Sequence, residues 1–269
     1  MKQNGKPRYK RSSDHVEKLL EFTGHPPSID DAVQRLVGDI LQGITVAPTD
    51  LEAVRARLNI ADCHAEDIPF SGELRRKGKE RTIVYSMHLS RDRRRFTVAH
   101  EMGHALLERV GYRLPHSGTA IERLCDKFAA EILMPKEIFL DQLGGSLTVE
   151  RLFDLKRVFQ VSLIAVGLRC FDFQRVSVFE VDDDSIVWGT GLVKKGPLYL
   201  IEQGLRLAVD KAGECEEGNQ EVYFVDKNIT YRGELEWSRQ STERTLFILK
   251  RCNDQKLTVT APSTSNFKP

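Results

Sequence analysis

The 269-residue sequence has no paired cysteine motif, no long apolar run and no excess of charge of one sign. Its five cysteines are scattered without a C-x-x-C pair, and an odd count argues against a disulfide framework. No apolar stretch approaches the ~20 residues that cross a bilayer, and the N-terminus lacks the apolar core of a signal peptide. Lys and Arg number 40 against 39 Asp and Glu, which gives no electrostatic case for nucleic-acid or membrane binding. We therefore expect a soluble, cytoplasmic protein with reduced thiols.

The composition is that of a folded protein. Hydrophobic residues make up 41% of the chain and charged residues 29%, which argues against wholesale disorder and against a repeat array. This length fits a catalytic domain plus a smaller domain. Lys and Arg recur between positions 2 and 11, and we expect this stretch to form a solvated tail rather than a phosphate-binding arm.

The apolar pattern predicts helices in the first two thirds of the chain and strands in the last third. Ser28 fits a helix N-cap, and Thr49 with Glu52 fits a capping box. The segment Lys77-Gly78-Lys79 between two short apolar runs has the signature of a β-hairpin. Helices are expected at about 29–42, 51–59, 93–109 and 121–133, with a helix-turn-helix-like pair within 148–170; strands are expected at 70–75, 81–86, 175–180, 184–188, 197–201, 221–225, 233–237 and 245–250.

The central motif is His100-Glu101-Met102-Gly103-His104, an H-E-x-x-H sequence within a predicted helix. At 3.6 residues per turn the two histidines lie about 40° apart on one helix face, so both imidazoles can bind one ion. Glu101 lies about 100° round from His100, where a base for water at the metal belongs. The alternative is a pair of buried histidines held by hydrogen bonds. Burying these polar groups on an otherwise apolar helix would be costly without a metal or partners, which favours the metal site.

The next predicted helix offers a third ligand. A catalytic zinc takes three protein ligands and keeps one open position, and Glu122 lies on the first turn of that helix. Asp126, four residues later on the same face, is placed to accept the other N–H of a ligand histidine. Glu122 also fits a capping box with Thr119. Glu131 is a competing ligand, but it lies about 180° round from Glu122, so the two cannot serve one ion.

Two segments of the chain resemble the ImmA/IrrE family of bacterial metallopeptidases. They are RFTVAHEMGH at 95–104 and ERLCDKFAAEILMP at 122–135, and the resemblance extends over roughly residues 30–170. Asp126 stands where the family's second helix motif usually has Asn. The match is more detailed than a bare five-letter motif.

The resemblance implies the roles of the site residues. In that family two histidines and a glutamate bind the metal, and the glutamate after the first histidine is catalytic. These roles carry over to His100, His104 and Glu122 as metal ligands and to Glu101 as the general base. Zinc is the expected ion for such a ligand set, with manganese or iron as alternatives.

The resemblance also implies an α+β fold with a zincin-like metallopeptidase domain, built of helices and a small edge sheet. The expected segments are a basic flexible tail at 1–28, the peptidase domain at 29–146, a helix-turn-helix-like segment at 147–172 and a β-rich C-terminal domain with a frayed end at 173–269. No motif in the last segment indicates its role.

The chemistry of such a site is the activation of water for attack on a peptide carbonyl. Glu101 would take the proton from the water and pass it to the leaving amine. Tyr112 and His116, in the loop between the ligand helices, are candidate donors to the oxyanion. A peptide substrate can add a strand to an exposed sheet edge, and Arg81–Ser86 is the expected edge.

The family resemblance implies a substrate class: a cytoplasmic helix-turn-helix repressor, cleaved to relieve repression of stress-response or mobile-element genes. The alternative is a non-proteolytic regulator that binds DNA or a repressor through residues 148–170 and holds a structural metal. The second helix of that segment, at 163–168, is almost wholly apolar and cannot contact base edges, so direct nucleic-acid binding is not expected.

Overall fold

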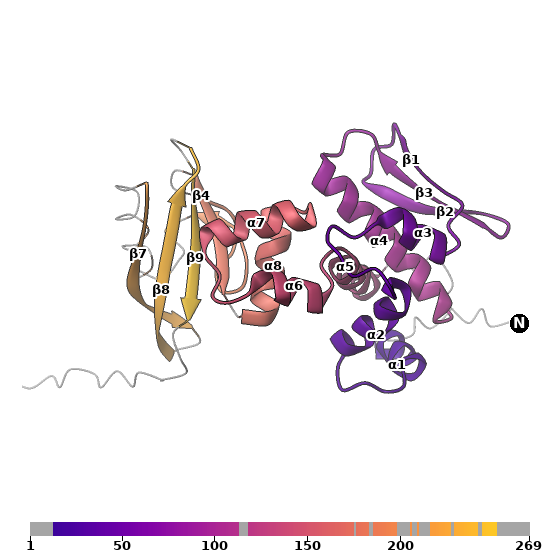
Figure 1. Cartoon of the computed structure of the whole chain (residues 1–269), viewed down its shortest axis with the longest axis horizontal. Helices are drawn as coiled ribbons and strands as arrows, with labels where there is room; N and C mark the ends of the chain where they lie inside the picture. Colours follow the sequence, from indigo (N-terminus) through magenta and orange to yellow (C-terminus); the bar gives the residue numbers. More distant parts are fainter. Residues whose placement is uncertain are drawn as a thin grey trace, which may run out of the picture. The chain divides into compact units, whose positions relative to one another are not determined.

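The computed structural model divides the chain into two compact units (Figure 1). Unit 1 comprises Met1–Gly144 and Leu155–Ser162, and unit 2 comprises Gly145–Asp154 and Leu163–Pro269. The structure describes residues 13–112, 118–174, 176–182, 185–197, 205, 209, 216–226, 229–241 and 244–251. Helices combine with two separate sheets, which confirms the expected α+β class. Among the described residues, no helix has the length and apolar character needed to cross a membrane.

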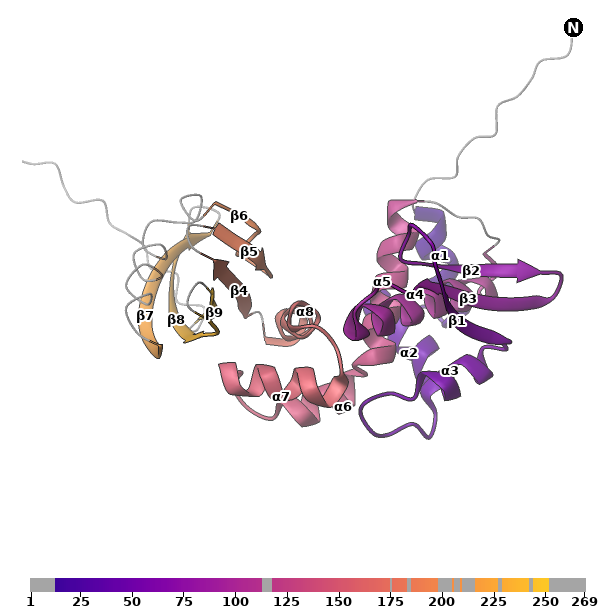
Figure 2. The same ribbon diagram turned by 90° about the horizontal axis from the view of Figure 1, so that it is seen from above.

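Unit 1 is built from helices around α4 and α5, with a three-stranded sheet beside α4 (Figure 2). Its helices are α1 (Ser13–Phe22), α2 (Ile29–Leu41), α3 (Leu51–Arg57), α4 (Arg91–Arg109), α5 (Thr119–Leu133) and α6 (Lys136–Leu143); its strands are β1 (Asp62–Glu66), β2 (Gly72–Lys77) and β3 (Glu80–Ser86). Helix α7 (Val149–Phe159) contains residues of both units. The core of unit 1 includes Phe128, Phe139, Phe159, Leu58, Ile83, Met102, Leu106 and Leu107, all essentially inaccessible to solvent.

Helices α2 and α3 follow the predicted pattern, except at the N-cap of α3. Helix α2 begins at its predicted cap, where the Ser28 hydroxyl accepts a hydrogen bond from the Asp31 N–H at 3.1 Å. Helix α3 is capped by Asp50, so the capping box expected at Thr49 is wrong. The Thr49 side chain is buried, and its hydroxyl donates to the Ile132 carbonyl at 2.7 Å.

Helix α1 lies inside the stretch expected to be a flexible tail, so that expectation is wrong for Ser13–Phe22. Leu19 is fully buried, and α1 packs against α2. Arg35 of α2 also donates to the Thr23 carbonyl at 3.1 Å. The basic stretch at 2–11 lies outside the described residues. A short amphipathic segment gains its stability from tertiary packing, which local composition does not reveal.

The small sheet has the strand order β1-β3-β2, with β1 parallel and β2 antiparallel to β3. Strands β2 and β3 form the predicted hairpin. The expectation that Arg81–Ser86 forms the sheet edge is wrong, because β1 pairs with β3 and makes it the central strand. The edge beside α4 is β2 instead, since Gly72 lies against α4 and Arg76 pairs with Glu108 of that helix.

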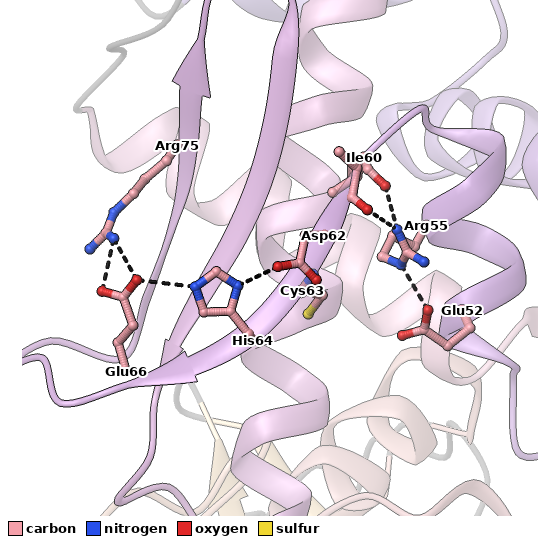
Figure 3. Close-up of polar contacts among 9 residues, drawn as sticks. Glu52, Arg55, Ile60, Asp62, Cys63, His64, Glu66 and Arg75 are labelled. Carbon is pink, nitrogen blue, oxygen red and sulfur yellow. Dashed lines mark hydrogen bonds and ion pairs between the residues drawn. The ribbon is translucent and has the colours of Figure 1, made fainter.

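Strand β1 was not predicted, because its sequence Asp-Cys-His-Ala-Glu is polar. Its backbone pairs with β3, and several side-chain contacts accompany this pairing (Figure 3). His64 lies between two carboxylates, with Nδ1 2.7 Å from Asp62 and Nε2 3.1 Å from Glu66. Arg75 of β2 donates to both oxygens of Glu66 at 2.8 and 2.9 Å. Arg55 of α3 donates to the carbonyls just before the strand, at Ile60 and Ala61.

Unit 2 contains α8 (Leu163–Gln174) and a six-stranded antiparallel sheet, so the β-rich C-terminal part is confirmed. The sheet order is β6-β5-β4-β9-β8-β7. Its strands are β4 (Ser177–Asp182), β5 (Ser185–Gly189), β6 (Gly196–Pro197), β7 (Glu217–Asp226), β8 (Ile229–Arg239) and β9 (Arg244–Arg251). The Phe179 and Phe247 rings stack in its core with centroids 5.0 Å apart.

Candidate metal centre

Helix α4 carries the three polar residues of the motif, as predicted. The His100 and His104 rings lie on one face with centroids 5.1 Å apart and planes inclined at 66°. Both side chains are largely buried, with 15% and 12% of their surface exposed. Glu101 is buried on a neighbouring face of the same helix. The helical spacing alone accounts for this arrangement.

A glycine allows α5 to approach this face closely. A side chain on Gly103 would place its Cβ 3.1 Å from Cys125 Cα, 3.2 Å from the Cys125 carbonyl oxygen and 3.2 Å from Phe128 Cβ. Such distances are tighter than ordinary contacts, so the two helices meet at van der Waals contact only because position 103 has no side chain. This contact brings the first turns of α5 over the two histidines.

Glu122 of α5 faces both imidazoles. Its Oε2 lies 3.1 Å from His100 Nε2, and its Oε1 lies 3.8 Å from His104 Nε2. The N-cap of α5 is Gly118, and no side chain caps the helix, so the capping-box alternative for Glu122 with Thr119 is not realised. The carboxylate therefore points to the histidines rather than back to its own backbone.

Asp126 occupies the position predicted for it behind His100. Its Oδ1 lies 2.9 Å from His100 Nδ1, which leaves Nε2 directed toward Glu122. Burial by itself would lower the pKa of His100, but the hydrogen bond to Asp126 and the nearby carboxylates raise it. The pKa of His104 is lowered, first by burial and then by the charge of His100. The two histidines thus share one face but differ in their outer partners.

Glu101 projects from α4 toward the edge strand β2, and its Cγ would lie 3.7 Å from a Cβ at position 72. Burial raises the pKa of its carboxyl group to about 7, opposed chiefly by the charge of His100. A carboxylate with a pKa near neutrality can take up and release a proton at cellular pH. This environment suits a general base better than a metal ligand or a surface charge.

Cys125 is a donor that the sequence analysis did not consider. Among the described residues, ligand atoms of His100, His104 and Cys125 all lie within 4.8 Å of one another. The signal available in the sequence is its spacing, three residues after Glu122 and one before Asp126 on the same helix. Burial raises the pKa of the Cys125 thiol, which disfavours the thiolate form that binds metals.

The remaining candidates lie apart from this cluster or are not described. Glu131 is buried, and its Oε1 accepts a hydrogen bond from the Lys136 N–H at 3.0 Å, at the start of α6. Tyr112 is buried, with Lys18 Nζ 5.6 Å from its ring centroid, and burial raises the pKa of its hydroxyl to about 12. His116 lies outside the described residues.

The donor set fits a divalent transition metal. The Glu122 carboxylate lies 3.1 Å from His100 Nε2 and 3.8 Å from His104 Nε2, and Asp126 can orient the first imidazole through its other nitrogen. The Nδ1 atom of His104 is buried without a hydrogen-bond partner among the described residues. A buried polar atom without a partner is unusual in a folded protein and is commonly explained by a bound ion or water.

A helix with an H-E-x-x-H motif, a carboxylate from the following helix and a small sheet beside the first helix define a metallopeptidase domain. Residues 42–171 match the family model of the IrrE N-terminal-like domain, peptidase family M78. This match confirms the resemblance to the ImmA/IrrE metallopeptidases.

Two further comparisons add little. A solved structure described as a Mycobacterium tuberculosis transcriptional regulator is similar at 16% identity and a TM-score of 0.49, covering 95% of this chain and 100% of that one. No curated protein matches the chain significantly.

Proposed function

We propose that the protein is a zinc-dependent endopeptidase that cleaves a cytoplasmic helix-turn-helix repressor and thereby relieves repression. The observation that carries this proposal is the convergence of His100, His104 and Glu122 beside a buried Glu101. We assign the activity to residues 29–146. Manganese or iron could take the place of zinc, because the same donors bind all three ions.

In this mechanism each residue has a separate task. His100, His104 and Glu122 would hold the ion, and Asp126 holds the His100 ring through its Nδ1. The bound ion would supply Lewis acidity toward the scissile carbonyl and toward water. The Glu101 carboxylate accepts a proton from the attacking water and then donates it to the leaving amine nitrogen. Its low exposure excludes bulk water from this exchange.

The free edge of β2 is the place where a substrate strand would bind. Ser86 N–H donates to the Ser71 carbonyl, so the alternation of an antiparallel pair turns the backbone groups of Gly72 and Leu74 away from β3. No described strand pairs with that side of β2. A peptide that adds there would lie next to Glu101, whereas the central strand β3 offers no such edge.

The helical pair at 147–172 is poorly suited to bind DNA directly, which favours a protein substrate over a DNA-binding role. Arg169 of α8 is buried, with its guanidinium carbon 4.7 Å from the Phe173 ring centroid, so it is not available to DNA. Selectivity for one protein substrate must come from surfaces outside β2, because main-chain pairing distinguishes side chains weakly.

The test compares wild type with Glu101→Gln. We expect both proteins to bind about one zinc per chain, since Glu101 is not a ligand, and only wild type to cut a helix-turn-helix repressor encoded near this gene. Metal content would be measured by mass spectrometry and the fragments by sequencing. His100→Ala serves as the control that loses both metal and cleavage. If Glu101→Gln cleaves as fast as wild type, or if neither protein binds metal, the assignment is wrong and a non-proteolytic regulator takes its place.

A further inference from the structure

We propose that an apolar groove with an acidic rim, within unit 1, docks a basic amphipathic helix of the protein substrate. The groove has a volume of about 890 Å³ and is lined by α2, the loop at 44–47, the end of α5, α6 and Val158 of α7. All of its lining residues belong to unit 1. The proposal rests on the proposed function only for the identity of the partner, a repressor that binds DNA.

The groove is separate from the metal centre. Glu131 of α5 lines it and follows Glu122 by nine residues, which places Glu131 about 180° round the helix and about 13 Å further along it. The buried Glu131 carboxylate accepts the hydrogen bond from the Lys136 N–H, so it belongs to the junction of α5 and α6. Substitutions in the groove should therefore leave metal binding unchanged.

Apolar side chains are exposed around the groove. Val46 is 69% exposed and Leu140 is 39% exposed, and both line it. Three partly exposed apolar residues join them: Ile44, Ile138 and Val158. On α2, Gly38 leaves the groove wide, because a Cβ there would meet nothing within 4 Å. A single exposed apolar side chain is ordinary, but several around one cleft mark a binding site.

The walls of the groove favour a helix as the occupant. Helices and one loop line it, and no strand of the described chain borders it. An extended peptide would bury backbone N–H and C=O groups there, where the wall helices already use their own backbone groups internally. A helix satisfies its backbone by itself and can lay apolar side chains at i, i+3, i+4 and i+7 into such a groove.

The charges at the rim favour a basic helix. Glu137 and Asp141 line the groove one helical turn apart on α6, and both are exposed. Neither forms an ion pair with a described residue. Lys136 is the one basic residue among those that line the groove. Lys or Arg beside the apolar stripe of a partner helix would complement the two carboxylates, and proteins that bind DNA carry such basic stretches.

The first test is fluorescence anisotropy of the labelled repressor with full-length Glu101→Gln, which should bind without cutting. In this background Glu137→Lys with Asp141→Lys should weaken binding by about tenfold or more, and the remaining binding should no longer weaken as salt is added. The matched control is Glu17→Lys with Glu21→Lys, the same charge change at the same spacing between exposed residues of α1, which does not line the groove. This control should change binding by less than about twofold.

Two variants test the apolar contact without a change of charge. Val46→Ser with Leu140→Ser should weaken binding by about tenfold, because less exposed apolar surface remains to be buried. Gly38→Leu should also weaken it by filling the groove, although the fold itself has room for the side chain. Unfolding temperature and zinc content, measured for each variant, separate a lost contact from a folding defect.

Cleavage distinguishes this proposal from the peptidase assignment. With Glu101 restored, the groove variants should raise KM for the intact repressor and leave kcat unchanged. If wild type cuts the repressor and every groove variant binds and cuts it equally well, the docking site is wrong while the peptidase assignment stands. If the groove variants lose binding but wild type cuts nothing, docking is supported and the peptidase assignment fails.

Two other outcomes overturn the docking proposal directly. One is a repressor that does not bind Glu101→Gln at all. The other is a wild-type dimer in sedimentation that the groove variants dissociate, because a second copy of the chain would then occupy the groove.

Discussion

The close approach of α4 and α5 can be tested by making the same substitution at two helical glycines. Gly38 lies in α2, where a Cβ would meet nothing within 4 Å, and Gly103 lies in α4 against α5. Alanine is favoured over glycine in a helix interior by about 1 kcal/mol. Gly38→Ala should therefore raise the free energy of unfolding by about 0.5–1 kcal/mol.

At Gly103 the same gain is opposed by steric overlap. The new Cβ would lie 3.1–3.2 Å from three atoms of α5, two of them backbone atoms that cannot rotate away. Overpacking of a close-packed interior costs about 1–3 kcal/mol. Gly103→Ala should thus be destabilised relative to Gly38→Ala by about 1–3 kcal/mol, and its metal affinity should fall because Glu122 moves with α5.

The assay is urea unfolding of the metal-free proteins in EDTA, followed by zinc titration. EDTA removes the contribution of metal binding to stability, so the first measurement reports packing alone. The reasoning is refuted if Gly103→Ala is stabilised as much as Gly38→Ala. It is also refuted if Gly103→Ala is destabilised but binds zinc as tightly as wild type.

Two other predictions concern hydrogen-bonded histidines. Asp126→Ala should lower zinc affinity by about 10–100-fold through the loss of its bond to His100, while Asp126→Asn, which keeps an acceptor, should lose less; calorimetric titration measures both. Hydrogen bonds from Glu66 and Asp62 raise the pKa of His64 above its ordinary 6.5. This pairing stabilises the fold fully below pH 6.5, and the effect is lost as the pH rises through the raised pKa. NMR titration of His64 should show a midpoint above 6.5 that falls in Asp62→Asn.

The sequence was sufficient to predict the helices that carry the proposed metal ligands. The periodicity of apolar residues in α4 and α5 is strong and local, and H-E-x-x-H spacing places two imidazoles on one face of any regular helix. The same helical geometry predicted that Glu122 and Glu131 lie on opposite faces and cannot bind one ion. In the structure the Glu122 carboxylate lies beside His100 and His104, whereas Glu131 accepts a hydrogen bond from the backbone at the start of α6.

Tertiary contacts decided what lies around those helices. β1 forms by pairing its backbone with a strand that lies further along the chain, Asp62 opposite Thr82, and this pairing moves β3 from the edge to the centre of the sheet. The place of Gly72 beside Glu101 likewise depends on the packing of a strand against a helix that begins some twenty residues later. Local sequence patterns determine on which face of a helix or strand a side chain lies. Which residues it contacts depends on packing between segments that are far apart in the sequence, and the sequence of one segment does not determine that packing.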